Sequence, residues 1–256
     1  MHPFPWPDGR EAAVSLTFDD GAQSQWETVI PMLNKRGMRG TIYITMADEG
    51  PFYRFADKWR AAVADGHEIG NHSMTHPCCR NLWVAGNGLN TDTMTVEAME
   101  EQIVEAKRRL EEELPDQAEH SFAYPCGERQ VGRGVNKQSY IPAVARHYIA
   151  GRAVGDGVSI NDPAQVDLAD IWAPMPVGEP GERLVEIAKR AYEQRKWAVL
   201  AFHGIGDRHL ANTVEAFAYL LDWLAERSDK IWVDTLIRVA RHVHDQQMAS
   251  SGRTQS

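Results

Sequence analysis

Short apolar runs alternate along the chain with longer segments in which apolar residues recur at helical spacing. The short runs are typical of buried strands, and the longer segments predict amphipathic helices. The expected strands lie at 14–18, 41–44, 67–69, 121–124, 148–150, 198–202 and 231–233. The expected helices lie at 24–35, 55–64, 95–114, 182–196, 214–226 and 235–244. This alternation predicts an α/β fold, built as a parallel sheet or as an α/β barrel.

The pattern continues without an internal repeat or a linker rich in proline, glycine or serine. We therefore expect one domain over residues 1–245, followed by a flexible C-terminal tail at 246–256. A hydrophobic fraction of 43% with 25% charged residues is ordinary for a globular protein. The pattern favours no particular oligomeric state.

Charge and hydropathy exclude several classes of partner. The formal net charge of -9 argues against a nucleic-acid-binding protein, which needs a basic face. No apolar stretch approaches the roughly 20 residues of a membrane span. The N-terminus lacks the basic start and apolar core of a signal peptide. We therefore expect a cytoplasmic location, or an extracellular one if a leader has been removed.

The three cysteines make a poor disulfide framework, since two of them, Cys78 and Cys79, are adjacent. Their number fits a reducing compartment. We expect Cys78 and Cys79 to be buried thiols with a structural role rather than metal ligands.

Four polar clusters follow expected strands, where parallel α/β folds gather functional groups. They lie at 17–21, 67–76, 122–127 and 202–204. Each has an ordinary reading when taken alone: an Asp-Asp-Gly sequence is usually a turn, and a His-x-x-x-His pair is often a surface coincidence. Their occurrence at four strand ends of one chain indicates a functional site.

Two of these clusters suit a divalent metal. Adjacent carboxylates at Asp19 and Asp20 repel each other unless a cation separates their roles. A single helical turn would aim His72 and His76 at one point. Two imidazole nitrogens and one carboxylate oxygen form an open site, which leaves positions for water and substrate.

The sequences Thr-Phe-Asp-Asp-Gly at 17–21, His-Ser-Met-Thr-His at 72–76 and Leu-Ala-Phe-His at 200–203 resemble motifs of the polysaccharide deacetylases of the NodB-homology type, carbohydrate esterase family 4. The resemblance runs from Val14 to Ala240. It implies a distorted (β/α) barrel that removes N- or O-linked acetyl groups from an acetylated carbohydrate. It also implies a divalent metal, commonly zinc, although cobalt, nickel and manganese suit the same ligands.

The resemblance also implies a role for each matching residue. The metal ligands would be Asp20, His72 and His76. Asp19 would be the general base and His203 the general acid. The backbone N–H of Cys126, next to Tyr124 in the third motif, would hold the oxyanion together with the metal.

The chain departs from the family pattern in the third and fourth motifs. Ala123 stands where the family has an arginine that orients the base carboxylate. Arg152, just beyond the expected strand 148–150, would supply that guanidinium from a neighbouring strand end, or it is an ordinary surface arginine. In the fourth motif Asp170 is the closest match for the carboxylate that tunes His203, with Asp162 and Asp167 as alternatives.

Several aromatic residues flank the histidine cluster and either stack on sugar faces or pack the helix 55–64. They are Phe52, Tyr53, Phe55, Trp59 and Trp83. Trp83, in a glycine-rich loop, is the residue we expect to contact substrate, along with Tyr124 and Cys126.

Three other functions fit parts of the pattern. A metal-independent amide hydrolase on the same fold would not need Asp20, His72 and His76 together. A non-haem iron oxygenase uses two histidines and one carboxylate, but it has no role for Asp19. A sugar-binding protein without activity would explain the altered third motif. The motifs favour the metal-dependent deacetylase over all three.

Overall fold

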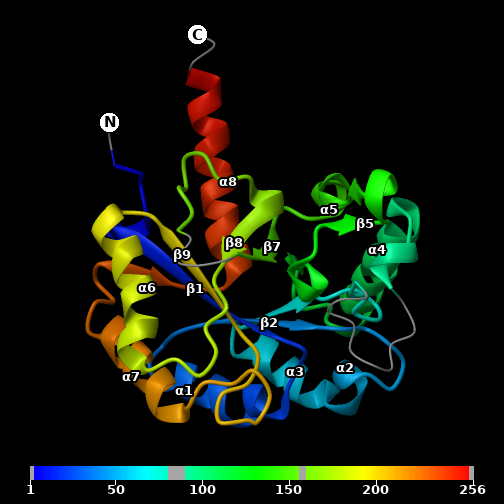
Figure 1. Ribbon diagram of the computed structural model, residues 1–256. Coiled ribbons are helices and arrows are strands. Elements are labelled where there is room, and N and C mark those ends of the chain that lie inside the picture. Colours follow the sequence, from blue (N-terminus) through cyan, green and yellow to red (C-terminus); the bar gives the residue numbers. More distant parts are fainter. Residues whose placement is uncertain (1–2, 80–89, 156–159, 254–256) are drawn as a thin grey trace.

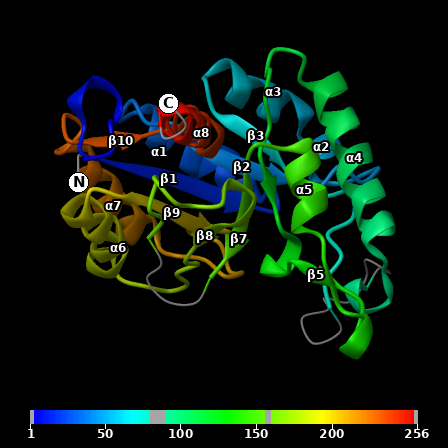
Figure 2. The same cartoon turned by 90° about the horizontal axis from the view of Figure 1, so that it is seen from above.

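Parallel strands of the described chain form one sheet that curls into a nearly closed barrel (Figures 1 and 2). The structure is a computed structural model that describes residues 3–79, 90–155 and 160–253. The strands of this sheet are β1 Ala12–Asp19, β2 Thr41–Ile44, β3 Glu68–Asn71, β4 Phe122–Ala123, β7 Gly151–Val154, β8 Ile171–Ala173, β9 Trp197–Phe202 and β10 Ile231–Val233. The distorted (β/α) barrel expected from the sequence is confirmed.

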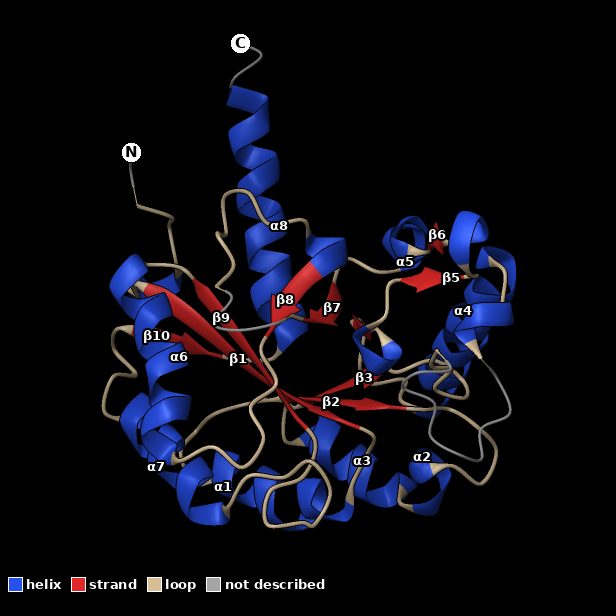
Figure 3. Ribbon diagram, in the orientation of Figure 1, coloured by secondary structure: helices blue, strands red, loops and turns tan. Residues whose placement is uncertain are grey.

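Helices surround this sheet (Figure 3). They are α1 Ile30–Asn34, α2 Pro51–Arg54, α3 Ala56–Ala64, α4 Val96–Glu113, α5 Ile141–His147, α6 Gly181–Gln194, α7 Val214–Ala225 and α8 Leu236–Arg253. A π-helical turn, Gln25–Val29, leads into α1, and a two-stranded hairpin of β5 Gln130–Val131 and β6 Gln138–Ser139 precedes α5. None of the described helices combines the length and apolar character that a bilayer span requires.

Strand β1 pairs in parallel with three other strands of the sheet. It pairs with β9 along one edge, and with β10 and then β2 along the other. All eight residues of β1 are buried, and Asp19 at its end is only 3% exposed. Val14, Leu16 and Phe18 belong to one core cluster, while Ala13 packs into a second cluster with α8. Burial on both faces explains why β1 is an almost continuous apolar run.

The barrel approaches closure where β8 meets β9. The Ala201 N–H donates to the carbonyl of Pro174, directly after β8, at 3.0 Å. Strand β8 and helix α5, which have only three and seven residues, were not predicted from the sequence. A strand was also predicted at 148–150, whereas β7 begins at Gly151, because the apolar run precedes the strand that carries the buried Arg152.

Helix α8 continues to Arg253, so the segment expected as a tail from residue 246 is helical up to that point. The side-chain amide of Gln247 donates to the carbonyls of Pro163 and Val166 at 3.0 and 3.1 Å. Those contacts join the later part of α8 to the loop that precedes β8.

A buried carboxylate at the amino end of β3 ties together β2, β4 and α8. Glu68 is only 2% exposed. Its Oε1 accepts from the N–H and hydroxyl of Ser121, and its Oε2 accepts from the Thr41 hydroxyl and the Ile237 N–H. Burial raises the pKa of Glu68, and these hydrogen bonds oppose that rise. The four donors together make this carboxylate a cross-link between three strands and a helix.

Glu68→Gln is expected to destabilise the fold, because its amide NH2 must face a backbone N–H that now donates to a carboxylate oxygen. We expect the free energy of unfolding in urea to fall by about 1–3 kcal/mol. Glu101→Gln, on the exposed face of α4, is the control and should leave it unchanged. Equal stability of the two variants would show that the Glu68 network contributes nothing.

Candidate metal and catalytic site

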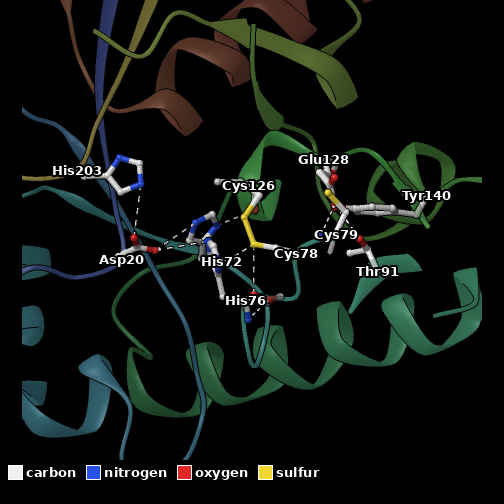
Figure 4. The surroundings of a disulfide bond; sticks show 12 residues. Asp20, His72, His76, Cys78, Cys79, Thr91, Cys126, Glu128, Tyr140 and His203 are labelled. Carbon is white, nitrogen blue, oxygen red and sulfur yellow. Dashed lines mark hydrogen bonds and ion pairs between the residues drawn. A yellow bond between two sulfur atoms is a disulfide. The ribbon is translucent and has the colours of Figure 1, made fainter. Parts of the chain in front are cut away.

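The carboxyl ends of the barrel strands bring the motif residues to one edge of the sheet. Asp19 ends β1 and Asp20 follows it, His72 follows β3, and His203 follows β9. Because these strands are parallel, their carboxyl ends lie on the same side. In Figure 4 the side chains of Asp20, His72, His76 and His203 point toward one another.

The two histidines of the second motif meet through a hydrogen-bonded turn. The side-chain oxygen of Asn71 accepts from the Ser73 N–H at 2.6 Å, and the Ser73 hydroxyl oxygen accepts from the His76 N–H at 3.0 Å. Ser73 and His76 both have left-handed backbone conformations, with φ of 64° and 54°. The helical turn predicted for this segment is therefore wrong, because two left-handed residues cannot lie within one right-handed helical turn.

The geometry of Asp20, His72 and His76 fits a divalent cation. Asp20 Oδ1 lies 3.7 Å from His72 Nε2 and 3.6 Å from His76 Nε2. The three ligand atoms lie within 4.8 Å of one another. This donor set of one carboxylate oxygen and two imidazole nitrogens is one that zinc and similar metals accept.

The environment of His72 keeps its ring ready to bind a metal. Its Nδ1 lies 2.9 Å from the Ala123 carbonyl, so Nδ1 carries the proton and Nε2 presents a lone pair toward Asp20. Burial, with a smaller contribution from His76, lowers the pKa of His72 to about 4. The imidazole is therefore neutral near pH 7. A lone pair facing a carboxylate oxygen is unfavourable unless a cation lies between them, and this supports the fit.

Asp19 and Arg152 form a buried ion pair beside this set. Arg152 is in β7, opposite Ala123 in the register of β4 and β7, and its Nη2 contacts Asp19 Oδ1. The Arg152 side chain is completely buried, and its guanidinium lies 5.0 Å from the Tyr43 ring centroid. The structure therefore places Arg152 against the Asp19 carboxylate and not on the surface.

The pKa of Asp19 results from opposing effects. Burial alone would raise it, but the charge of Arg152, assisted by His72 and His203, holds the pKa below its usual value. Asp19 is therefore a carboxylate at neutral pH despite its burial. Nε and Nη1 of Arg152 are buried without a hydrogen-bond partner among the described residues.

His203 occupies the opposite side of Asp20. Its Nε2 lies 3.5 Å from Asp20 Oδ2, and its Nδ1 is buried without a hydrogen-bond partner in the described ranges. Gln25, which the sequence analysis missed, lies behind it. The Gln25 amide donates to the carbonyls of Asp19 and His203 at 2.5 and 2.9 Å and so joins the ends of β1 and β9. The only sequence signal for Gln25 was that a polar residue lies in the turn after the first motif.

The remaining candidates lie away from these groups or outside the described residues. Asp170 pairs with Arg129, at 2.9 Å, and no contact with His203 is found among the described residues. The Tyr124 hydroxyl donates to the Ala169 carbonyl at 2.6 Å, which keeps that ring in the core. Trp83 lies outside the described residues. Phe52 and Trp59 are buried, which supports a packing role for these two, whereas Tyr53 is exposed.

Cys126 follows β4 in a left-handed conformation and forms a disulfide with Cys78, with 5.8 Å between the two Cα atoms. The expectation of a Cys78 thiol is therefore wrong, and Cys79 is the cysteine outside the disulfide. The two partners are separated by 48 positions, and the adjacent ends of β3 and β4 bring them together. Because two of the three cysteines form a disulfide, their number no longer favours a reducing compartment.

Residues 7–139 match the model of the polysaccharide deacetylase family. This match covers just over half of the chain and includes the motifs that supply Asp19, Asp20, His72 and His76. The chain belongs to the polysaccharide deacetylase family.

Two curated proteins match short segments of the chain. A segment of 71 residues is 31% identical to a gellan lyase from a Bacillus species, and covers 28% of this chain and 3% of that protein. A segment of 72 residues is 29% identical to a chitin deacetylase from a Pestalotiopsis species, and covers 28% of this chain and 24% of that protein. The chain thus matches less than a quarter of the length of these relatives.

Solved structures share the fold over almost the whole chain. The chain is similar to a peptidoglycan deacetylase from Bacillus subtilis, with a TM-score of 0.55, 14% identity and coverage of 98% of this chain and 99% of that one. It is also similar to an allantoinase, with a TM-score of 0.64, 15% identity and coverage of 94% and 92%. At these identities the similarity establishes the fold alone.

Arg152→Met is expected to destabilise the metal-free protein, because it leaves the Asp19 carboxylate buried without a partner. We expect a loss of about 3–5 kcal/mol at neutral pH in urea unfolding. Asp19→Asn combined with Arg152→Met should recover part of this loss. Arg108→Met, which breaks two exposed ion pairs on α4, is the control, with an effect of at most about 1 kcal/mol.

The same variant should also change the dependence of stability on pH. The lowered pKa of Asp19 stabilises the wild-type fold above the usual pKa of 3.8, and this contribution is lost as the pH falls through the folded-state pKa. Without Arg152, burial raises the pKa of Asp19, so the deficit of Arg152→Met should shrink as the pH is lowered toward 4. A deficit independent of pH would contradict the proposed coupling.

Proposed function

We propose that this chain is a metal-dependent hydrolase that removes acetyl groups from an acetylated carbohydrate. The observation that carries the proposal is the convergence of Asp20, His72 and His76 beside the buried Asp19–Arg152 pair and His203. Family membership supports the same conclusion, as does the short similarity to a chitin deacetylase.

Asp20, His72 and His76 would hold the cation, and zinc suits them, as do cobalt, nickel and manganese. When bound, the cation lowers the pKa of a water molecule and polarises the acetyl carbonyl. Asp20 is half-exposed, so the set remains accessible from solvent, whereas His72 is fixed from behind by Ala123.

The Asp19 carboxylate accepts the proton of the attacking water, and Arg152 fixes the orientation of this carboxylate. His203 then donates a proton to the leaving nitrogen or oxygen, and the Gln25 amide holds the backbone of both groups in register. The N–H of Cys126 donates to the oxyanion. Arg152 is a positioning residue in this scheme and takes the place of the arginine that the family has at position 123.

The alternative of a metal-independent amide hydrolase gives no reason for the ligand set. An enzyme without a metal has no use for two imidazoles and a carboxylate with their ligand atoms within 4.8 Å of one another. A sugar-binding protein without activity likewise has no use for a buried ionised Asp19, which costs free energy to maintain.

Acetate release from chitooligosaccharides, peptidoglycan fragments, acetylated xylan and an acetylated phenol tests the proposal, with added zinc and with a chelator. We expect release that the chelator abolishes and zinc restores. Asp20→Ala should remove it, and His203→Ala should lower it by about 10²–10⁴-fold. Asp57→Ala, an exposed carboxylate on α3, is the control and should retain full activity.

Release that continues in the chelated protein would overturn the metal dependence. If the protein binds a metal tightly but releases acetate from no member of the panel, the acetylated carbohydrates of the panel would be excluded as substrates. If the protein neither binds a metal nor releases acetate, the result would favour a protein that only binds sugar.

A further inference from the structure

The Cys78–Cys126 disulfide lies directly beside the proposed metal ligands. Cys78 Sγ is 3.5 Å from Nδ1 of His76, two residues earlier in the chain (Figure 4). Cys78, Cys126 and His76 form a second group whose ligand atoms lie within 4.8 Å of one another. The imidazole of His76 therefore belongs to two potential ligand sets, with Nε2 facing Asp20 and Nδ1 facing sulfur.

The redox state of the two cysteines decides which set is available. A disulfide sulfur is a poor ligand for zinc, whereas a thiolate is among the strongest that proteins offer. In the oxidised protein the ligands present are therefore Asp20, His72 and His76. In the reduced protein two sulfur ligands would join His76 Nδ1, and a fourth position would stay open to water.

The loops that carry the cysteines are also held together by contacts that do not involve sulfur. Glu128 Oε2 accepts from the Cys79 N–H at 2.9 Å and from the Thr91 hydroxyl at 2.7 Å. The Thr91 N–H in turn donates to the Cys78 carbonyl at 3.1 Å, and the Tyr140 hydroxyl donates to the Glu128 carbonyl. Breaking the disulfide therefore leaves the two loops side by side.

The two sulfurs need only a small movement to bind one metal. Zinc–sulfur bonds of about 2.3 Å place two tetrahedral sulfur ligands roughly 3.7 Å apart. Rotation of the two cysteine side chains can supply this separation while Glu128 holds the backbones.

We propose that reduction of the Cys78–Cys126 disulfide creates a second metal site, formed by the two sulfurs and Nδ1 of His76, which withdraws His76 from the catalytic set. A dithiol supplies two electrons and two protons, the S–S bond becomes two thiols, and the dithiol is oxidised to its own disulfide. The metal then displaces the thiol protons. The new site stands on its own, and its inhibitory effect rests on the proposed function.

The two sites exclude each other because a neutral imidazole has only one lone pair for a metal. Its other nitrogen carries a proton. When Nδ1 binds a cation, Nε2 is protonated and no longer binds one beside Asp20. Reduced protein is therefore expected to hold zinc and yet to lose activity.

Cobalt(II) titration tests the site without reference to activity. The whole chain is reduced with a dithiol, freed of it by gel filtration under nitrogen, and compared with the oxidised protein. Reduced protein should develop the intense near-ultraviolet thiolate-to-cobalt charge-transfer band at a stoichiometric amount of Co²⁺, and oxidised protein should not. Cys78→Ser and Cys126→Ser should each weaken the band strongly, while the matched control Cys79→Ser should retain it.

Two results would overturn the site: a reduced protein without the band, or a band that survives Cys78→Ser unchanged. Reaction of Cys78 and Cys126 with a thiol reagent in the denatured, air-oxidised protein would overturn the control by reduction, because the disulfide would then be absent. Acetate release with zinc then tests the inhibition. It should fall on reduction and return on reoxidation, and in Cys78→Ser it should not respond to the dithiol.

The two proposals fail in different ways. A cobalt band in a protein that releases no acetate in either redox state would support the second metal site and contradict the deacetylase function. Release that is indifferent to reduction, in a protein that shows the band, would overturn the competition for His76.

Discussion

The contact between the buried carboxylate of Asp19 and the buried guanidinium of Arg152 is the interaction on which the rest of the site depends. A carboxylate removed from water is costly to ionise, and burial alone would raise the pKa of Asp19. Arg152 reverses that effect from the neighbouring strand β7. The barrel can therefore keep a charged group at the carboxyl end of β1, next to the candidate metal ligands.

Arg152 places a guanidinium against Asp19, although Ala123 stands at the position where the resemblance leads us to expect an arginine. Ala123 and Arg152 are directly paired in the register of β4 and β7, so the guanidinium enters the site from the strand next to the one that carries Ala123. The carbonyl of the same Ala123 holds the His72 ring. One short strand pair thus positions both a metal-ligand candidate and the partner of the base candidate.

The alternation of strands and helices was sufficient for an α/β fold and for β1, β2 and β9, whereas the barrel was implied by the family resemblance. The motifs at strand ends were sufficient to predict that Asp19, Asp20, His72, His76 and His203 share one site. Each of these residues belongs to a motif of four or five consecutive residues, which can be recognised locally. Other features depend on contacts between distant segments. The Cys78–Cys126 disulfide spans 48 positions, and the pairing of Asp170 with Arg129 depends on the loops after β4 and before β8.

The role of Gln25 and the burial of Tyr124 are likewise set by tertiary packing. Gln25 is completely buried and bonded to two backbone carbonyls, although its residue type is usually exposed. The turn at Ser73 and His76 also escaped the sequence analysis, because a spacing of four suggests a helix and the left-handed conformations that replace it leave no pattern.

X-ray absorption at the zinc edge of the oxidised, zinc-loaded protein tests the central claim most directly. The account predicts a first shell of nitrogen and oxygen alone, with two imidazole scattering patterns that are reduced to one in His76→Ala. Sulfur in the first shell of the oxidised protein, or a shell unchanged by both His72→Ala and His76→Ala, would contradict the assignment of Asp20, His72 and His76 as the metal ligands.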